Sequence, residues 1–170
     1  MSPRAYVGLG ANLGERATTC RAALALLLEQ PGITLHRASS FYETEPQGPV
    51  QSQPRFLNAV VALDTLLSPA ELLELLLSIE DDLGRTRTVP QGPRVIDLDL
   101  LLYGERCLDT PELTLPHPRL LQRRFVLVPL LEVAPELRHP QTGRRLADHL
   151  TEAPPGEVTW CPELNLLTAS

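Results

Sequence analysis

Short apolar and alternating stretches along the chain predict β-strands, and longer stretches of helical spacing separate them. Strands are predicted at about 4–9, 33–43, 55–65 and 95–103. The first of these strands is expected to end in a turn at Gly8–Gly10. Helices are predicted at about 14–29, 69–83 and 145–152, with another from about 119. Ser68 and Glu71 are spaced as a capping box at the start of the second helix, and Gly84 is expected to end it.

Two loops interrupt this pattern. Residues 44–54 contain three prolines, and residues 85–94 are basic and rich in proline and glycine. The order β-α-β-β-α-β matches a ferredoxin-like split βαβ plan, which is an α+β fold with a mainly antiparallel sheet and helices on one face. No internal repeat or linker is visible, so we expect one domain over residues 1–170.

The segment R-V-I-D-L-D-L at 94–100 carries the strongest chemical signal. Side chains alternate along a strand, so Asp97 and Asp99 point the same way, with Cα atoms roughly 6.5 Å apart. The opposite face is expected to be apolar and to comprise Ile96, Leu98, Leu100 and Leu102. Adjacent carboxylates repel each other, and a pair of Mg²⁺ ions bridging a polyphosphate would suit such hard oxygen ligands. The alternative is an ordinary strand with acids on its hydrated face.

Three arginines lie within the ten residues 85–94, shortly before this pair of carboxylates: Arg85, Arg87 and Arg94. Guanidinium groups bind phosphate oxygens bidentately, so this loop suits a clamp that closes over a triphosphate. The alternative is a solvated basic loop that pairs with Glu80, Asp81 and Asp82. Glu80 itself either pairs with an arginine or reaches a metal-bound water.

Two further clusters suit a nucleotide and a flat ring. His117 lies between two prolines and is followed by Arg119 and Arg123, a set that suits an α-phosphate or a ribose. The alternative is a structural histidine beside a hydrated helix face. Phe56 and Asn58 share one strand face and offer a stacking surface beside an amide that both donates and accepts. The alternative is a core phenylalanine and a capping asparagine.

Composition narrows these possibilities. All 15 basic residues are arginine, which excludes phosphate-binding loops and Schiff bases that require lysine. The net charge of -6 argues against a nucleic-acid-binding surface. The three cysteines are widely spaced, the N-terminus does not resemble a signal peptide, and charges interrupt the leucine-rich runs. We therefore expect a cytoplasmic protein that contacts no membrane.

Several short motifs occur here in one order. They are G-A-N-L-G at 10–14, S-S-F-Y-E-T at 39–44, F-L-N-A at 56–59, G-R-x-R at 84–87, G-P-R-x-x-D-L-D at 92–99, L-P-H-P-R at 115–119 and F-V-L-V-P-L-L-E-V-A-P-E-L at 125–137. This set resembles the 6-hydroxymethyl-7,8-dihydropterin pyrophosphokinase family over about residues 5–150, leaving 151–170 as a C-terminal tail. The resemblance implies transfer of a diphosphate from ATP to the pterin hydroxymethyl group, with release of AMP, in tetrahydrofolate biosynthesis.

The resemblance also implies a role for individual residues. Asp97 and Asp99 would hold two Mg²⁺ ions that bridge the phosphates of ATP, the co-substrate. Arg85 and Arg87 would lie on a catalytic loop that closes over ATP. Nucleotide contacts are implied for Glu80, Arg87, Arg94, Leu100, Thr114, His117 and Arg123. Pterin contacts are implied for Asn12, Thr44, Pro46, Phe56, Asn58 and Phe125, with the ring between the two phenylalanines.

Four residues depart from the pattern of the family. Gln91 stands where an aromatic often seals the closed loop, Leu77 where a polar residue often approaches adenine, and Glu45 and Gln47 where apolar residues often lie near the pterin. These departures bear on loop closure and affinity rather than on the type of reaction. Two other functions stay open from the residues alone: a non-catalytic regulatory module that binds a nucleotide or metal, and a Mg²⁺-dependent nucleotide hydrolase. We expect a free-standing monomer.

Overall fold

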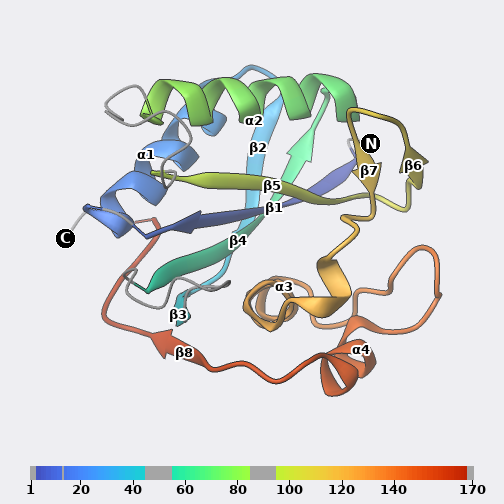
Figure 1. Ribbon diagram of the computed structural model, residues 1–170. Coiled ribbons are helices and arrows are strands. Elements are labelled where there is room, and N and C mark those ends of the chain that lie inside the picture. Colours follow the sequence, from blue (N-terminus) through green and yellow to red (C-terminus); the bar gives the residue numbers. More distant parts are fainter. Residues whose placement is uncertain (1–2, 13, 45–54, 85–94, 168–170) are drawn as a thin grey trace.

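An antiparallel sheet forms the centre of the protein (Figure 1). The computed structural model of the chain describes residues 3–12, 14–44, 55–84 and 95–167. Within these residues the main sheet has six strands, which are β1 (Arg4–Ala11), β2 (Ile33–Ala38), β3 (Phe41–Thr44), β4 (Phe56–Thr65), β5 (Asp97–Tyr103) and β8 (Val158–Cys161). Their order is β5-β1-β4-β3-β8, and β2 also pairs with β4. A separate ribbon pairs β6 (Leu108–Asp109) with β7 (Thr114–Leu115).

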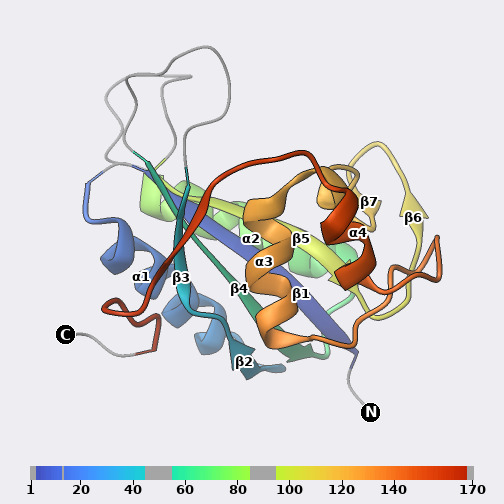
Figure 2. The same ribbon diagram turned by 90° about the horizontal axis from the view of Figure 1, so that it is seen from below.

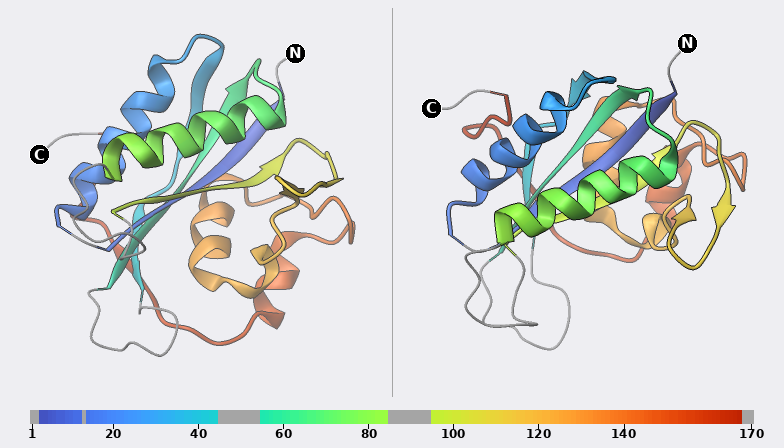
Figure 3. Two further views of the ribbon diagram at one scale, coloured as in Figure 1. Left: turned by 45° about the horizontal axis from the view of Figure 1, so that its top comes forward. Right: turned by 90° about the horizontal axis from the view of Figure 1, so that it is seen from above.

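Helices cover both faces of this sheet (Figures 1, 2 and 3). One face carries α1 (Arg16–Glu29) and α2 (Pro69–Gly84), and the other carries the 3₁₀ helix η1 (Leu120–Gln122), α3 (Arg124–Val133) and α4 (Leu146–Glu152). The predicted antiparallel α+β fold is confirmed, but the expectation of helices on one face is wrong. The reason is that β4 is apolar on both faces, so each face has to be covered. Leu57 and Leu63 enter the core under α1 and α2, whereas Val60 and Ala62 enter the core under α3 and α4.

The capping box predicted for α2 is present. The Ser68 N–H donates to Glu71 Oε1 at 2.8 Å, and the Glu71 N–H donates to Ser68 Oγ at 3.2 Å. The helices predicted at 14–29 and 145–152 correspond to α1 and α4. The helix predicted from about 119 begins later than expected, because a 3₁₀ turn comes first and α3 starts at Arg124.

Two strand boundaries differ from the prediction. The segment 33–43 is two strands rather than one, because the regular pairing with β4 is interrupted at Ser39. The Ser39 N–H donates to the Val60 carbonyl at 2.8 Å, and its hydroxyl oxygen accepts the Val60 N–H at 2.9 Å. Gly8 and Gly10 lie within β1, paired to β4 on one side and β5 on the other, and do not form a turn. The two glycines therefore leave a part of the sheet surface without side chains.

The strand β5 contains an irregularity that changes the orientation of its last residues. Ile96, Leu98 and Leu100 are buried under α1 and α2, as predicted. Leu102 is instead buried on the α3 side, because Leu101 has no partner in the register between the Val7–Leu100 and Tyr6–Leu102 pairs. The expectation that Leu102 continues the apolar face is therefore wrong.

The segment predicted to be a tail contains a strand. β8 pairs antiparallel with β3, so Trp160 lies opposite Tyr42 at the end of the sheet. None of the described helices combines the length and apolar content that crossing a bilayer requires.

A buried pair of histidines joins the segment after α3 to α4. His139 and His149 are both buried, with ring centroids 5.7 Å apart. Nδ1 of His139 accepts the N–H groups of Gln141 and Thr142 at 3.2 and 3.3 Å, while Nε2 of His149 contacts the Thr142 hydroxyl. Glu152 is the nearby acid, 3.9 Å from Nδ1 of His149. Burial lowers the pKa of His139, and the neighbouring His149 lowers it further.

The lowered pKa of His139 is expected to make the stability of the protein sensitive to acid. Because the pKa of His139 is lower in the folded protein, the unfolded chain binds the proton more tightly as the pH falls below about 6.5. We expect the free energy of unfolding to decrease from pH 7 to pH 5, and the decrease to be smaller in His139→Asn. Asparagine can accept the same backbone N–H groups without titrating. Urea unfolding at several pH values measures this, and equal slopes for both proteins would contradict the prediction.

Candidate active site

A cavity of about 240 Å³ opens between the strands β1, β4 and β5 and the start of α3. Its floor comes from the sheet and one wall from the first turn of the helix. The described residues that line it are Gly8, Leu9, Gly10, Thr44, Phe56, Asn58, Ala59, Val60, Asp97, Asp99, Arg123, Phe125 and Val126. Carboxylates, a guanidinium, an amide and aromatic rings thus face one open cavity.

Strand register arranges these groups in rows across the sheet. Asn58 of β4 pairs with Gly10 of β1, which pairs with Asp97 of β5. In the next row, Gly8 pairs with Asp99. Adjacent strands lie about 4.8 Å apart, so the backbones of Asn58 and Asp97 are separated by about 10 Å, with Gly10 between them. The two ends of the cavity are therefore an amide end and a carboxylate end.

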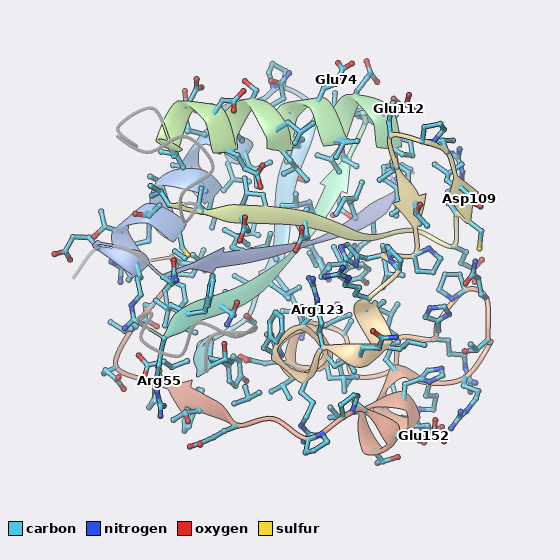
Figure 4. The ribbon with its side chains drawn as sticks, viewed as in Figure 1. Arg55, Glu74, Asp109, Glu112, Arg123 and Glu152 are labelled. Atoms are coloured by element: carbon cyan, nitrogen blue, oxygen red, sulfur yellow. The ribbon has the colours of Figure 1, made fainter. Side chains whose placement is uncertain are left out.

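Asp97 and Asp99 form the carboxylate end. Both lie on the α3 face of β5, as the alternation predicts, and both are partly exposed in the cavity. Arg123, which precedes α3, extends toward the sheet (Figure 4), and its Nη1 lies 3.6 Å from Asp99 Oδ2. The same guanidinium lies over the Phe125 ring, 5.6 Å from its centroid. Arg123 thus offsets part of the negative charge in the cavity.

Thr44, Phe56, Asn58 and Phe125 form the amide end. Asn58 is buried, and its Nδ2 donates to Thr44 Oγ1 at 2.8 Å, which fixes the orientation of the amide. Phe56 comes from β4 and Phe125 from α3, so the two rings reach the cavity from different elements. This end suits a flat polar ring that stacks and forms hydrogen bonds along its edge.

Known proteins are similar to this chain in sequence and in fold. The family model of 7,8-dihydro-6-hydroxymethylpterin-pyrophosphokinase (HPPK) matches residues 6–135. The 2-amino-4-hydroxy-6-hydroxymethyldihydropteridine pyrophosphokinase of Bacillus subtilis is 46% identical over 143 residues, which is 84% of this chain and 85% of that protein. The chain belongs to the HPPK family.

A second relative agrees with this assignment, and a solved structure shows the same fold. The pyrophosphokinase of Pseudomonas aeruginosa that bears the same name is 46% identical over 154 residues, covering 91% of this chain and 94% of that protein. The crystal structure of Plasmodium falciparum HPPK-DHPS wild type with pteroate has the same fold, with a TM-score of 0.71 at 14% identity. That match covers 89% of this chain and 44% of the Plasmodium chain, so this chain spans less than half of its length.

Glu80, one of the nucleotide contacts that the HPPK resemblance implies, touches the strand that carries the carboxylates. Its Oε2 accepts the Leu98 N–H at 2.7 Å. β5 lies at the edge of the sheet among the described strands, and Glu80 satisfies a backbone donor between Asp97 and Asp99 that none of these strands pairs. Glu80 therefore helps to hold the backbone of the carboxylate pair, and its contact with ATP stays a prediction.

His117 lies at the outer edge of β5, because its N–H donates to the Leu101 carbonyl at 2.9 Å. Burial lowers the pKa of His117 against the opposing effect of Asp99, and Arg123 and Arg119 lower it further. Nδ1 accepts the Arg119 N–H at 3.1 Å, so in the neutral ring the proton is assigned to Nε2. His117 thus presents a donor suited to a phosphate or a hydroxyl.

The other predicted residues fall into three groups. The Leu100 side chain is buried in the core opposite the cavity, and Thr114 lies on β7 beside β5, so neither lines the cavity. Asn12 is buried just beyond β1, and Leu77 is exposed on α2. The residues outside the described ranges are Glu45, Pro46, Gln47, Arg85, Arg87, Gln91 and Arg94.

Sequence reasoning did not assign Gly8, Gly10, Val60 or Val126 to the site, although they line the cavity. The two glycines are spaced i, i+2 within a strand pattern, which places both on one face. This spacing could have indicated that both glycines face the site, but the prediction of a turn at Gly8–Gly10 excluded that interpretation.

Proposed function

We propose that this chain transfers a diphosphate from ATP to the hydroxymethyl oxygen of 6-hydroxymethyl-7,8-dihydropterin in the cavity described above. The products are AMP and the pterin diphosphate, an intermediate of tetrahydrofolate biosynthesis. Membership of the HPPK family over residues 6–135 supports the reaction. The observation that carries its location is that Asp97 and Asp99 share one cavity with the Asn58–Thr44 pair.

The carboxylate end fits magnesium. Asp97 and Asp99 offer two hard oxygen ligands on one strand face, and the described residues include no cluster of three or more His, Cys, Asp or Glu that could hold a metal. Mg²⁺ commonly takes only one or two carboxylates and completes its octahedron with waters and substrate phosphates. Two Mg²⁺ ions bound there would neutralise charge on the β- and γ-phosphates of ATP.

The amide end fits the pterin. Phe56 and Phe125 are proposed to stack on either side of the ring, while Asn58 and Thr44 form hydrogen bonds with its edge. The distance of about 10 Å across Gly10 leaves room between ring edge and carboxylates for the hydroxymethyl arm and the β-phosphate. The two substrates would thus meet above the glycine floor.

The chain's own residues mainly position the reactants. The hydroxymethyl oxygen attacks the β-phosphorus, the bond to the oxygen bridging the α- and β-phosphates breaks, and that oxygen leaves with AMP. Arg123 and the Nε2–H of His117 are proposed to bind phosphate or ribose oxygens and to hold the nucleotide in line with the attacking oxygen. The hydroxyl proton passes to solvent. Arg85, Arg87 and Arg94 are proposed to close over the nucleotide and exclude water.

Product analysis tests the reaction. With ATP, Mg²⁺ and the reduced pterin alcohol, we expect equimolar AMP and pterin diphosphate, and no nucleotide turnover without the pterin. Chromatography of the nucleotides distinguishes the alternatives. ADP with a pterin monophosphate would refute diphosphate transfer, ATP consumption without pterin would indicate a hydrolase, and nucleotide binding without any turnover would indicate a regulatory module.

The setting of the enzyme is part of this proposal. We propose that residues 1–170 act as one pyrophosphokinase domain and as a monomer, which light scattering in solution tests. Cytoplasmic location is supported by the three free cysteines, of which Cys20 and Cys161 are buried and Cys107 is exposed. Burial raises the pKa of the Cys20 thiol to about 12, so this cysteine stays protonated and unreactive.

A further inference from the structure

The two glycines in the cavity floor differ in what surrounds them. A Cβ atom placed on Gly10 would lie 3.0 Å from Oδ1 of Asn58 and 3.9 Å from Cδ1 of Phe56. The three atoms nearest to a Cβ placed on Gly8 all belong to the Leu101 side chain and lie at 3.5 Å or more, which is ordinary van der Waals contact. The absence of a side chain is therefore needed at Gly10 in a way that it is not at Gly8.

Asn58 has little freedom to move away from such an atom. It is buried in β4, which is paired on both sides, to Gly10 of β1 and to Tyr42 of β3. Its Nδ2 donates a hydrogen bond to Thr44 Oγ1, and rotation of the amide would break that hydrogen bond. A methyl group at position 10 would therefore either displace Asn58 Oδ1 or push apart the strands that carry the cavity.

We propose that Gly10 is a specificity-determining residue for the acceptor substrate. Its lack of a side chain leaves room beside it for the Asn58 amide oxygen and the Phe56 ring, and thereby keeps a slot open for a planar heteroaromatic ring. The carboxylate end does not depend on this slot, so the donor nucleotide is bound independently of it. This inference rests on the proposed function, because it assumes that the amide end receives the pterin.

Gly10→Ala is expected to weaken binding of a pterin analogue by about tenfold or more, because the amide hydrogen bonds are lost or misaligned. Affinity for a non-hydrolysable ATP analogue with Mg²⁺ is expected to stay within about twofold, as calorimetry would show. Gly156→Ala is the matched control: no atom lies within 4 Å of its added Cβ, and it lies outside the cavity. Thermal unfolding confirms that each variant is folded.

A double-mutant cycle with Asn58→Ala decides whether the effect passes through the amide. We expect Gly10→Ala to cost less than about threefold in pterin affinity once the amide is absent. An equal cost in both backgrounds, or loss of ATP-analogue binding together with pterin binding, would overturn the proposal. If the wild-type protein binds no pterin, the proposed function fails. If it binds pterin and Gly10→Ala binds equally well, only the inference on Gly10 fails.

Discussion

Replacing Asp99 by asparagine is expected to lower kcat/KM for diphosphate transfer by at least about 10²–10³-fold. Asparagine has nearly the same shape, so the cavity should keep its form while one of its two negative charges is lost. A neutral amide offsets neither the charge of a divalent cation nor its demand for anionic oxygen ligands. Steady-state formation of AMP at saturating Mg²⁺ measures the loss, and Asp97→Asn is expected to show a loss of similar size.

The same substitution elsewhere on the chain provides the control. Asp109 is exposed on β6, outside the residues that line the cavity (Figure 4), so Asp109→Asn is expected to stay within about twofold of the wild type. Activity of Asp99→Asn within threefold of wild type would contradict the assignment of the metal ligands. That result would mean that the metal ligands lie elsewhere. It would not change the class of reaction, which is tested separately by the products.

Local signals in the sequence were enough for much of the fold. The capping box of Ser68 and Glu71 depends on residues three apart, and it forms as predicted. The common face of Asp97 and Asp99 depends only on alternation along one strand, and it is also confirmed. These features could be predicted because the residues that decide them are neighbours in the sequence.

Features decided by distant pairing could not be predicted in this way. β8 is only four residues long and half of it is exposed, so its sequence shows no buried face, and its partner β3 lies more than 100 residues earlier. Gly8 and Gly10 have the composition of a turn, yet both belong to a strand because β4 and β5 pair with β1 on either side. The orientation of Leu102 likewise depends on a bulge that forms only against β1.

The same limit applied within the site. The sequence placed Phe56 and Asn58 on one strand, but only the pairing of β4 with β1 shows that a glycine separates them from the carboxylates. It also did not predict that Arg123 pairs with Asp99, since the two residues come from different elements on one face of the sheet. The residue types that form the site could therefore be recognised from short motifs. The spacing between the amide end and the carboxylate end could be known only from the pairing of the strands.

Replacing Arg123 by methionine is expected to raise the KM for ATP by about 10–100-fold. The Arg123 side chain is about three-quarters buried in the cavity wall, with 24% of it exposed, and its guanidinium reaches Asp99 from the start of α3. Methionine keeps most of the apolar packing on Phe125 but can neither pair with a carboxylate nor bind a phosphate. Initial-rate measurements with ATP as the varied substrate test this, and Arg106→Met, at an exposed turn after β5, is the matched control.

The affinity for the metal alone is expected to increase in Arg123→Met, whereas the affinity for ATP decreases. Without nucleotide, Arg123 offsets the charge of Asp99 at 3.6 Å, so its removal leaves the two carboxylates more negative and more attractive to a divalent cation. We expect Mn²⁺, used as a probe for Mg²⁺, to bind Arg123→Met roughly two- to fivefold more tightly, since partly exposed ion pairs contribute little. Weaker metal binding together with weaker ATP binding would show that Arg123 merely supports the cavity. Opposite changes would show that one guanidinium pairs with the carboxylate before the substrate arrives and with the nucleotide afterwards.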